Sequence, residues 1–326
     1  DILRMKEDGE TPEAKLELTG ELFPGAYQET INFFTENGYE PGETLFIFPY
    51  DWRKDISLTA PLLDQKINEI KNQTGSDKVD IVSHSMGGLV ARYYISDPER
   101  ASNVRKLFTL GTPHLGSVKF LETLEYGDCL TIFSILSNPI CFGVTPLEVK
   151  DVIQNSIGGY ELNPSRKYFD FYIGEGNHYP FPFRDDTDID NNGETGPLNY
   201  NQIKSLLTNI GHNTSLFKPS EVFHALDSSL STTNGVDVYV ISGSGIPTLG
   251  QIIEKYSIDI FGIKIPKRDE LLINGDDTVP LYSASLNDPS RNLSYSGNAK
   301  IYYTNQKHGS LITDCSALNL VKNILD

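Results

Sequence analysis

One serine lies between a short apolar run and a helical pattern, and its surroundings favour nucleophilic chemistry. Ser85 stands in residues 80–88, which read Asp-Ile-Val-Ser-His-Ser-Met-Gly-Gly. A nucleophile elbow holds its serine on a strained turn between a strand and a helix, so the residues two before and two after must be small. Ser83 and Gly87 meet this requirement, with Ser83 in place of the usual first glycine. The alternative is a serine that only caps a helix.

A serine hydroxyl needs a general base, and a histidine near the end of the chain fits that role. In hydrolases with such an elbow, the acid and then the histidine follow the serine along the chain. His308 satisfies this order and lies at a predicted strand-to-helix junction. His84 adjoins the nucleophile, so we expect its side chain to point away from Ser85. His114 and His224 precede the candidate acids and break the order.

The acid that orients this histidine is expected between the predicted strand at Val236–Ile241 and His308. Residues 274–280, Asn-Gly-Asp-Asp-Thr-Val-Pro, form a polar turn ahead of an apolar Val-Pro pair. Either Asp276 or Asp277 would hold the imidazole and stabilise its charged form. The alternative is an ordinary turn stabilised by its own Asp side chains.

Five short runs of apolar or β-branched residues are predicted to be the strands that position these groups. Such continuous runs are typical of strands buried on both faces. Helical patterns at Ala60–Lys71 and Met86–Ile95 separate some of them. Strands that alternate with helices predict the α/β class, with a mainly parallel, doubly wound sheet. The predicted strands are Leu45–Phe48, Val79–Val82, Leu107–Leu110, Val236–Ile241 and Lys300–Tyr303.

The alternation of predicted strands and helices stops for about 120 residues after Leu110. We interpret residues 117–235 as an inserted cap, and residues 1–116 and 236–326 as the core domain. Within the cap, the apolar segment Leu130–Val144 is expected to contact lipid or an acyl chain, or to pack against the sheet.

The composition limits the partners of the chain. A net charge of −17 repels phosphate backbones, which argues against nucleic acid as a partner. It also argues against purely electrostatic docking on anionic lipid, so any transient membrane or lipid-surface contact is expected to be apolar. No run approaches the roughly 20 apolar residues of a membrane span. We therefore expect a soluble protein; secretion is compatible with the sequence, and the oligomeric state does not follow from it.

The cysteines and one acidic loop give weaker signals, and neither predicts a metal or cofactor. Cys129, Cys141 and Cys315 lack the spacing of metal ligands. The first two would pair across a short loop in an oxidising compartment, or remain free thiols. The loop Asp188–Gly193 matches the first half of a calcium loop, but its twelfth position is Asn199 where a Glu is required. A solvated acidic loop is therefore favoured.

Together these motifs resemble the lecithin:cholesterol acyltransferase and lysosomal phospholipase family of α/β-hydrolases. The resemblance spans residues from about 21 to about 323, and the Pro-Tyr-Asp-Trp-Arg run is its most specific part. The segments that carry it are 49–53, 84–88, 110–117, 223–227, 243–248 and 275–280, together with His308.

The resemblance implies a capped α/β-hydrolase without a cofactor, acting on lipid esters through an acyl-enzyme on Ser85. The family's acid directly precedes a Gly in an Asp-Gly-Thr-Val pattern. Asp277 occupies that Gly position here, so the resemblance selects Asp276, with Asp277 as the alternative. Trp52 and His114 are candidates for substrate contact. Water and an alcohol would use the same three residues, so the acyl acceptor cannot be predicted.

One part of the family pattern is missing from the sequence. Members carry an upstream apolar strand whose Pro-Gly loop gives a backbone N–H to the oxyanion hole, and nothing in residues 1–44 resembles it. The backbone N–H of Met86 is expected to be the other donor. We therefore expect an N-terminally truncated part of a longer protein. The alternatives to a lipid enzyme are a non-catalytic lipid- or ligand-binding module and an esterase for soluble substrates.

Overall fold

The computed structural model describes residues 2–16, 27–127, 145–171, 180–227, 233–258, 261–288 and 293–326. The predicted pair Cys129–Cys141 and the apolar segment Leu130–Val144 lie outside these residues, whereas Cys315 is a free, exposed thiol. Among the helices that the structure describes, none is long and apolar enough to cross a membrane.

Four parallel strands form the central sheet, and they coincide with four of the five predicted strands. Their order across the sheet is β1-β2-β5-β10. The predicted α/β class with a parallel sheet is therefore confirmed. The strands are β1 (Val79–His84), β2 (Val104–Leu110), β5 (Asp237–Gly243) and β10 (Lys300–Thr304).

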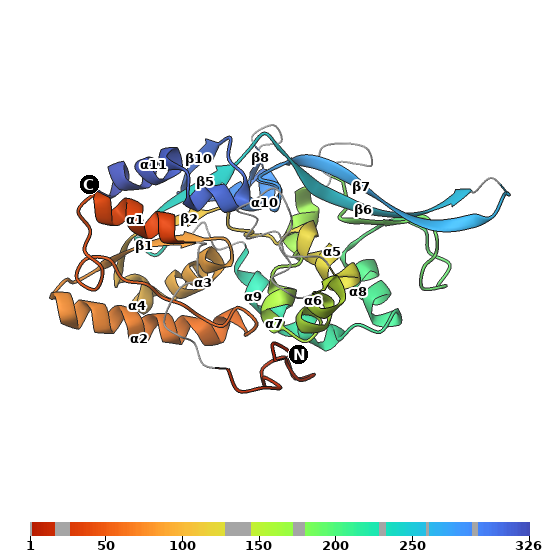
Figure 1. Cartoon of the computed structure of the whole chain (residues 1–326), viewed down its shortest axis with the longest axis horizontal. Coiled ribbons are helices and arrows are strands. Elements are labelled where there is room, and N and C mark those ends of the chain that lie inside the picture. Colours follow the sequence, from red (N-terminus) through yellow and green to blue (C-terminus); the bar gives the residue numbers. More distant parts are fainter. Residues whose placement is uncertain are drawn as a thin grey trace.

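Helices cover both faces of this sheet (Figure 1). Those that flank it include α1 (Gln28–Glu36), α2 (Ile56–Thr74), α3 (Met86–Ile95), α4 (Pro98–Ala101) and α11 (Cys315–Leu325). Successive residues of a strand point to opposite faces, and β2 shows the result. Leu107 joins the apolar cluster with residues of α2 and α3, whereas Phe108 joins the cluster with residues of α1 and α11.

The predicted strand at Leu45–Phe48 is wrong. Leu45 makes only an isolated bridge with Pro41, and residues 46–50 form no strand. A strand needs the backbone groups of a neighbour. β1 pairs with β2 on one edge, and no strand of the described part pairs with its other edge. The apolar run therefore has no ladder to join within the part of the chain described.

Short helices dominate the region between β2 and β5. The aromatic side chains of Tyr160, Tyr168 and Phe171 lie in its apolar cluster, which also includes residues from the second sheet described below. The elements here are α5 (Val118–Tyr126), α6 (Pro146–Ile153), α7 (Ile157–Glu161), η2 (Arg166–Phe171), β3 (Phe183–Asp185), β4 (Gly196–Leu198), α8 (Tyr200–Asn209), η3 (Thr214–Leu216) and α9 (Phe217–His224).

A second sheet contains a long antiparallel hairpin that the sequence did not predict. The hairpin consists of β6 (Ile246–Ile258) and β7 (Lys264–Gly275), and the sheet order is β4-β3-β6-β7. This sheet joins strands from both sides of residue 236, where we placed the boundary between cap and core. The boundary itself stays a prediction.

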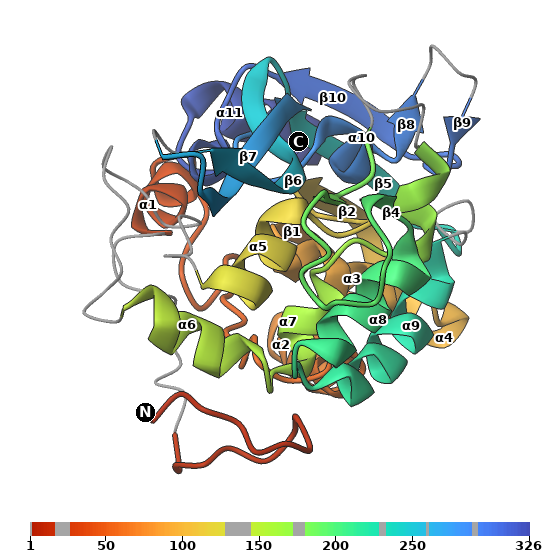
Figure 2. The ribbon, with the colours of Figure 1, turned by 90° about the vertical axis from the view of Figure 1, so that its right-hand side faces the viewer.

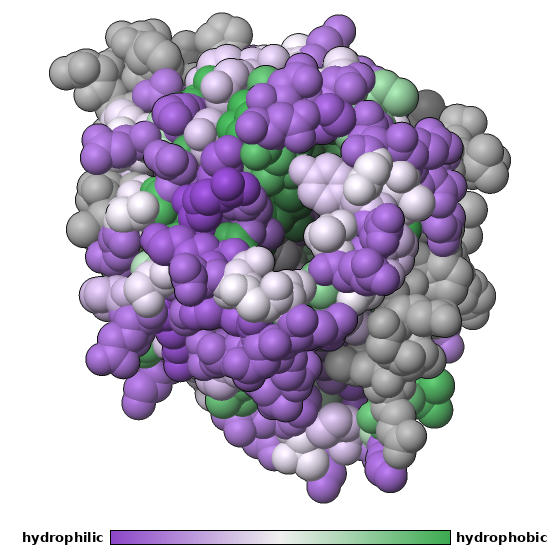
Figure 3. Space-filling view, turned by 90° about the vertical axis from the view of Figure 1, so that its left-hand side faces the viewer, coloured by the Kyte–Doolittle hydropathy of each residue, from purple (hydrophilic) through white to green (hydrophobic). Residues whose placement is uncertain are grey.

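The β6–β7 hairpin projects from the body of the molecule (Figure 1), and Figure 2 looks along it with the helices α5 to α9 below. The opposite end differs: hydrophilic residues cover most of it, around a hollow in which hydrophobic residues are visible (Figure 3). The chain after the hairpin forms α10 (Leu281–Ser285), β8 (Asn287–Asp288), β9 (Leu293–Ser294), β10, η6 (His308–Ile312) and α11.

Candidate active site

Ser85 lies on a strained turn between β1 and α3. Its φ of 53° and ψ of −129° are a backbone conformation that a residue with a side chain rarely adopts. The turn requires close packing around it. A Cβ atom added to Gly88 would lie only 1.9 Å from Oγ1 of Thr112, so only glycine lets the first turn of α3 pack against this residue. The predicted elbow geometry is present.

His308 links Ser85 to an acid through both of its ring nitrogens. Its Nε2 is 3.0 Å from Oγ of Ser85, and its Nδ1 is 2.9 Å from Oδ2 of Asp276. All three residues are buried, with exposed fractions of 7% for Ser85, 1% for His308 and 0% for Asp276. With the carboxylate ionised, Nδ1–H donates to Asp276 and Nε2 is left to accept the proton of the serine hydroxyl.

The backbone around Asp276 holds its carboxylate in place. Oδ1 accepts hydrogen bonds from the backbone N–H groups of Thr278 (3.1 Å) and Val279 (2.6 Å), so Oδ2 is the oxygen that meets the imidazole. The backbone N–H of His308 also donates to the carbonyl oxygen of Asp276, at 2.7 Å. Asp277 instead lies 3.6 Å from Nζ of Lys307. The structure therefore brings Asp276, and not Asp277, to His308.

The electrostatic surroundings favour a charged imidazole at position 308. Burial alone would lower the pKa of His308, but the charge of Asp276, its hydrogen bond and the charge of Asp277 together raise that pKa above its usual value. The site thus stabilises the imidazolium that forms when the histidine accepts a proton.

Two glycines at the carboxyl edge of the sheet make room for the Asp276–His308 pair. Gly111 directly follows β2 with a φ of 58°, and a Cβ atom there would lie 3.0 Å from Nδ1 of His308 and 3.1 Å from Oδ2 of Asp276. Gly243 ends β5, and a Cβ atom there would lie 2.5 Å from Cβ of Asp276. Sequence reasoning named both glycines only as parts of motifs and missed this role.

His84 also contacts the base, which the sequence did not predict. Its Nε2 is 3.0 Å from the backbone oxygen of His308, and the two rings lie 4.7 Å apart. Because a carbonyl only accepts, Nε2 carries the proton, and Nδ1 accepts from the hydroxyl of Tyr27 at 3.3 Å. Burial lowers the pKa of His84 to about 3, so this histidine stays neutral. It holds the backbone of the base without competing for its proton.

The remaining predicted site residues occupy different surroundings. Met86 is the first residue of α3, so its backbone N–H belongs to the first turn, which has no acceptor within the helix. Trp52 lies near it, since a Cβ atom on Gly158 of α7 would lie 2.0 Å from the backbone oxygen of Trp52 and 2.9 Å from Cε of Met86. His114 has no exposed surface, and the structure does not bring it to the triad.

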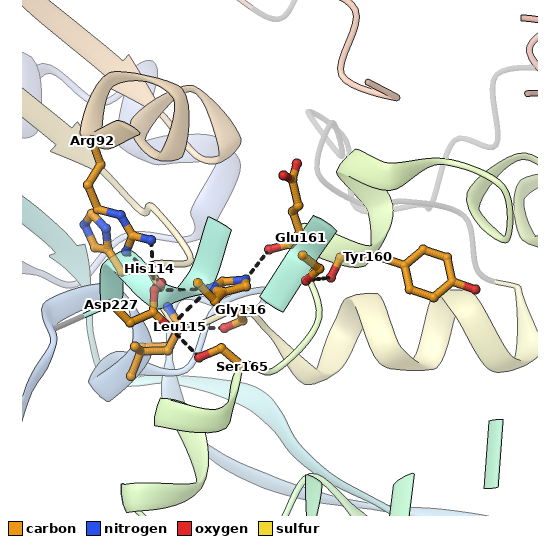
Figure 4. Close-up of polar contacts among 11 residues, drawn as sticks. Arg92, His114, Leu115, Gly116, Tyr160, Glu161, Ser165 and Asp227 are labelled. Carbon is orange, nitrogen blue, oxygen red and sulfur yellow. Dashed lines mark hydrogen bonds and ion pairs between the residues drawn. The ribbon is translucent and has the colours of Figure 1, made fainter. Parts of the chain in front are cut away.

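His114 belongs to a buried polar network around Arg92 and Asp227 (Figure 4). Arg92 donates to the backbone oxygen of His114 at 2.9 Å and forms an ion pair of 2.8 Å with Asp227. Ser165 donates to the other oxygen of Asp227 at 2.6 Å. His224 lies 3.1 Å from this carboxylate. Because Arg92 lies on α3 and His224 on α9, the network ties the helix behind Ser85 to the region between β2 and β5.

A cavity of about 310 Å³ lies beside this network and does not include the triad. It is lined by residues of α7, η2, α8 and α9, among them Tyr160, Ser165 and His224. Among the described residues, no group of three or more His, Cys, Asp or Glu could hold a metal ion. In the acidic loop, Asp188 accepts from the backbone N–H of Gly193, and Asn199 caps α8.

These features define an α/β-hydrolase: helices cover both faces of a parallel sheet, and a strained serine follows a strand. The order along the chain is Ser85, Asp276, His308. A chain of the Tle4–Tli4 complex shares the fold, with a TM-score of 0.51 and 18% identity over 96% of this chain and 76% of that one. A sequence profile of the lecithin:cholesterol acyltransferase family matches residues 15–141. Over these residues the chain is similar to this family.

Three curated relatives are similar to parts of the chain. Phospholipase A(1) LCAT3 of Arabidopsis thaliana is 31% identical over 141 residues, which cover 35% of this chain and 32% of the relative. The human lysosomal phospholipase A and acyltransferase is 33% identical over 28% of this chain and 23% of the relative. The phosphatidylcholine-sterol acyltransferase of Gallus gallus is 24% identical over 272 residues, which cover 80% of this chain and 57% of the relative. The chain thus spans about a third or less of the first two.

Proposed function

We propose that the chain cleaves or transfers the acyl groups of lipid esters, with Ser85 as nucleophile, His308 as general base and Asp276 as the acid that orients it. The observation that carries the proposal is the continuous pair of hydrogen bonds from Asp276 through His308 to Ser85. Burial keeps bulk water from this pair, and His308 can activate the hydroxyl of Ser85 as a nucleophile.

The reaction would proceed in two balanced steps. Oγ of Ser85 attacks the ester carbonyl while Nε2 of His308 takes the hydroxyl proton, and the resulting tetrahedral intermediate expels an alcohol that receives this proton. The acyl-enzyme remains on Ser85. Water or a second alcohol then attacks it, again giving its proton to His308, and the acyl product leaves as the serine recovers the proton.

The negative oxygen of the tetrahedral intermediate needs hydrogen-bond donors. We assign one donor, the backbone N–H of Met86, because this residue follows the nucleophile and opens α3. The N-terminus of a helix also carries partial positive charge, which adds to the stabilisation of an anion there. The backbone N–H of Met86, next to Ser85, is therefore the one oxyanion donor that we assign among the described residues.

The lipid part of the proposal is supported by the relatives. All three curated relatives above carry names for phospholipid cleavage or acyl transfer. We further propose that residues 117–235 act as a cap over the site, because α7 closes over Trp52 and Met86 through the glycine contact described above. Trp52 is then the candidate for substrate contact.

Covalent labelling tests the proposal directly. A fluorophosphonate probe is expected to label the wild-type chain, and Ser85→Ala is expected to abolish labelling and to reduce hydrolysis of p-nitrophenyl butyrate by roughly 10⁶-fold. Ser83→Ala is the matched control, because Ser83 is a buried serine two residues away whose hydroxyl bonds to the backbone of Phe108. Labelling that survives in Ser85→Ala, with its circular dichroism unchanged, would refute the role of this residue.

A further inference from the structure

The distal part of the β6–β7 hairpin concentrates exposed apolar side chains. We define the hairpin tip as residues 256–258 and 261–265. Among the described residues, 15 large hydrophobic side chains are exposed, and five of them lie in this short tip. Such a cluster on a monomer marks a surface that another molecule covers. The five are Tyr256 (42%), Ile258 (71%), Phe261 (80%), Ile263 (59%) and Ile265 (47%).

The tip is apolar on both sides of the ribbon. The cross-strand pair Ile258 and Lys264 lies on one face, and the pair Ser257 and Ile265 lies on the other. β6 pairs with β3 only over Ile252–Glu254, so farther out the two strands have only each other among the described strands. In Figures 1 and 2 this part stands clear of the body. A wedge with apolar side chains on both faces fits insertion into an apolar layer better than contact with one flat surface.

Basic side chains lie along the outer part of the hairpin, although the whole chain carries a net charge of −17. Residues 255–268 contain four of them and one acidic side chain. Lys255 and Lys267 form ion pairs with Asp269, and Arg268 pairs with Glu122, so Lys264 is the basic side chain of the tip itself. At the tip itself, Nζ of Lys264 lies 5.5 Å from the ring centroid of Tyr256. A lysine and a tyrosine beside exposed aliphatic groups are typical of the interface between lipid headgroups and acyl chains.

We infer that the hairpin tip docks the protein on anionic lipid surfaces, with its apolar side chains inserted among acyl chains and Lys264 at the headgroups. The inference rests on the proposed function, which supplies the lipid substrate. It adds the part of the protein that contacts the lipid surface. The charge of the whole chain opposes such docking, so the exposed apolar side chains of the tip are expected to supply most of the binding.

Vesicle sedimentation tests the inference, in a Ser85→Ala background so that the lipid is not consumed. Removal of two apolar side chains, Phe261→Ser with Ile263→Ser, is expected to weaken partitioning by at least about tenfold. Lys264→Glu is expected to weaken it by about fivefold or more on vesicles of phosphatidylcholine with phosphatidylglycerol, and much less on phosphatidylcholine alone. The matched controls, Leu58→Ser with Leu62→Ser on the exposed side of α2 and Lys78→Glu before β1, should bind like the parent.

Activity separates this inference from the proposed function. With Ser85 restored, all of these variants are expected to hydrolyse soluble p-nitrophenyl butyrate at the wild-type rate, whereas only the tip variants lose hydrolysis of phospholipid in vesicles. Tip variants that partition like the parent, a parent that does not bind vesicles, or controls that weaken equally would each overturn the inference. The inference would also be overturned if the tip substitutions changed only the sedimentation coefficient of the protein in lipid-free buffer. The tip would then contact another protein molecule and not lipid. Absence of all esterase activity would refute the proposed function and leave the partitioning result standing.

Discussion

The central sheet and the β6–β7 hairpin are built from the same kind of element, yet their surroundings are opposite. Strands of the sheet are covered by helices on both faces, and the carboxyl edge of that sheet carries the buried triad. The hairpin is covered only at its base, and its exposed side chains become more apolar toward the tip. The difference teaches that the buried triad lies where packed elements surround it, whereas the exposed apolar side chains lie where the described structure covers them least.

Asp276 links the two regions. Asp276 directly follows β7, so the strand that leads to the exposed tip also delivers the acid to His308. Ile252 is fully buried on β6, whereas Ile258 six residues farther along the same strand is 71% exposed. The comparison between buried base and exposed tip can therefore be tested within one hairpin.

The largest effect is expected from the acid at the base of the hairpin. Asp276→Asn should reduce hydrolysis of a soluble ester by roughly 10⁴-fold, because an amide leaves His308 in the wrong tautomer. Asp277→Asn should change the rate by only a few-fold, since Asp277 faces Lys307. Steady-state kinetics on p-nitrophenyl butyrate provide the measurement. Equal losses for the two variants would show that the structure has selected the wrong acid.

A stability experiment compares the two isoleucines. Ile252→Ala should lower the free energy of unfolding by about 2–5 kcal/mol, because it removes buried methyl groups and leaves a cavity. Ile258→Ala should change it by no more than about 0.5 kcal/mol, since the side chain is already in water. Urea denaturation measures both values. A large loss for Ile258→Ala would mean that the tip packs against the protein, contrary to the comparison drawn above.

The smallest expected effect concerns pH and separates the chemistry from the docking. His308 acts as a base only when neutral, and its pKa is raised, so the rate on a soluble ester should increase with pH to a half-maximum above about 6.5. Stability follows the opposite sign: the contribution of the charged His308 is fully present below about pH 6.5 and is lost as pH rises through the raised pKa. Vesicle binding should stay flat between about pH 6 and 8, because the exposed apolar side chains of the tip do not titrate.

The sequence predicted those parts of the fold that local patterns determine. The strands around Val79, Leu107, Val236 and Lys300 are continuous apolar runs, and each becomes a strand of the parallel sheet. The helix predicted at Met86–Ile95 has the observed bounds. Leu45–Phe48 has a similar composition but finds no partner strand among the described residues, so a local pattern alone could not show that it forms no strand.

The triad illustrates what order along the chain can and cannot determine. Order along the chain selected Ser85 and His308 and left Asp276 and Asp277 open. The family resemblance selected Asp276, and the structure brings these three residues together. The contact of His84 with His308 depends on the crossing of distant segments, so no local signal predicted it. His114 was a candidate for substrate contact in the sequence, but only the fold shows that it belongs to the buried network of Arg92 and Asp227.

The hairpin escaped prediction because its strands do not alternate cleanly between apolar and polar residues. β6 begins with a buried segment and ends with an exposed one, and β7 contains Pro266 and a run of charged residues. A strand that changes its surroundings along its length gives no single period. The sequence therefore provided no prediction for its apolar tip, and the predicted lipid contact was the segment Leu130–Val144.

The pairing of Ile246 with Gly275 closes the hairpin at its base, so the chain returns to where it left. An insertion or deletion of two residues in each strand beyond Glu254 would keep the register, the alternation of faces and the position of Asp276. The reach of the ribbon is thus free to vary among related sequences while the catalytic geometry stays constant. Length polymorphism in this segment is expected to be tolerated, and it would adjust how far the active site stands from whatever the tip touches.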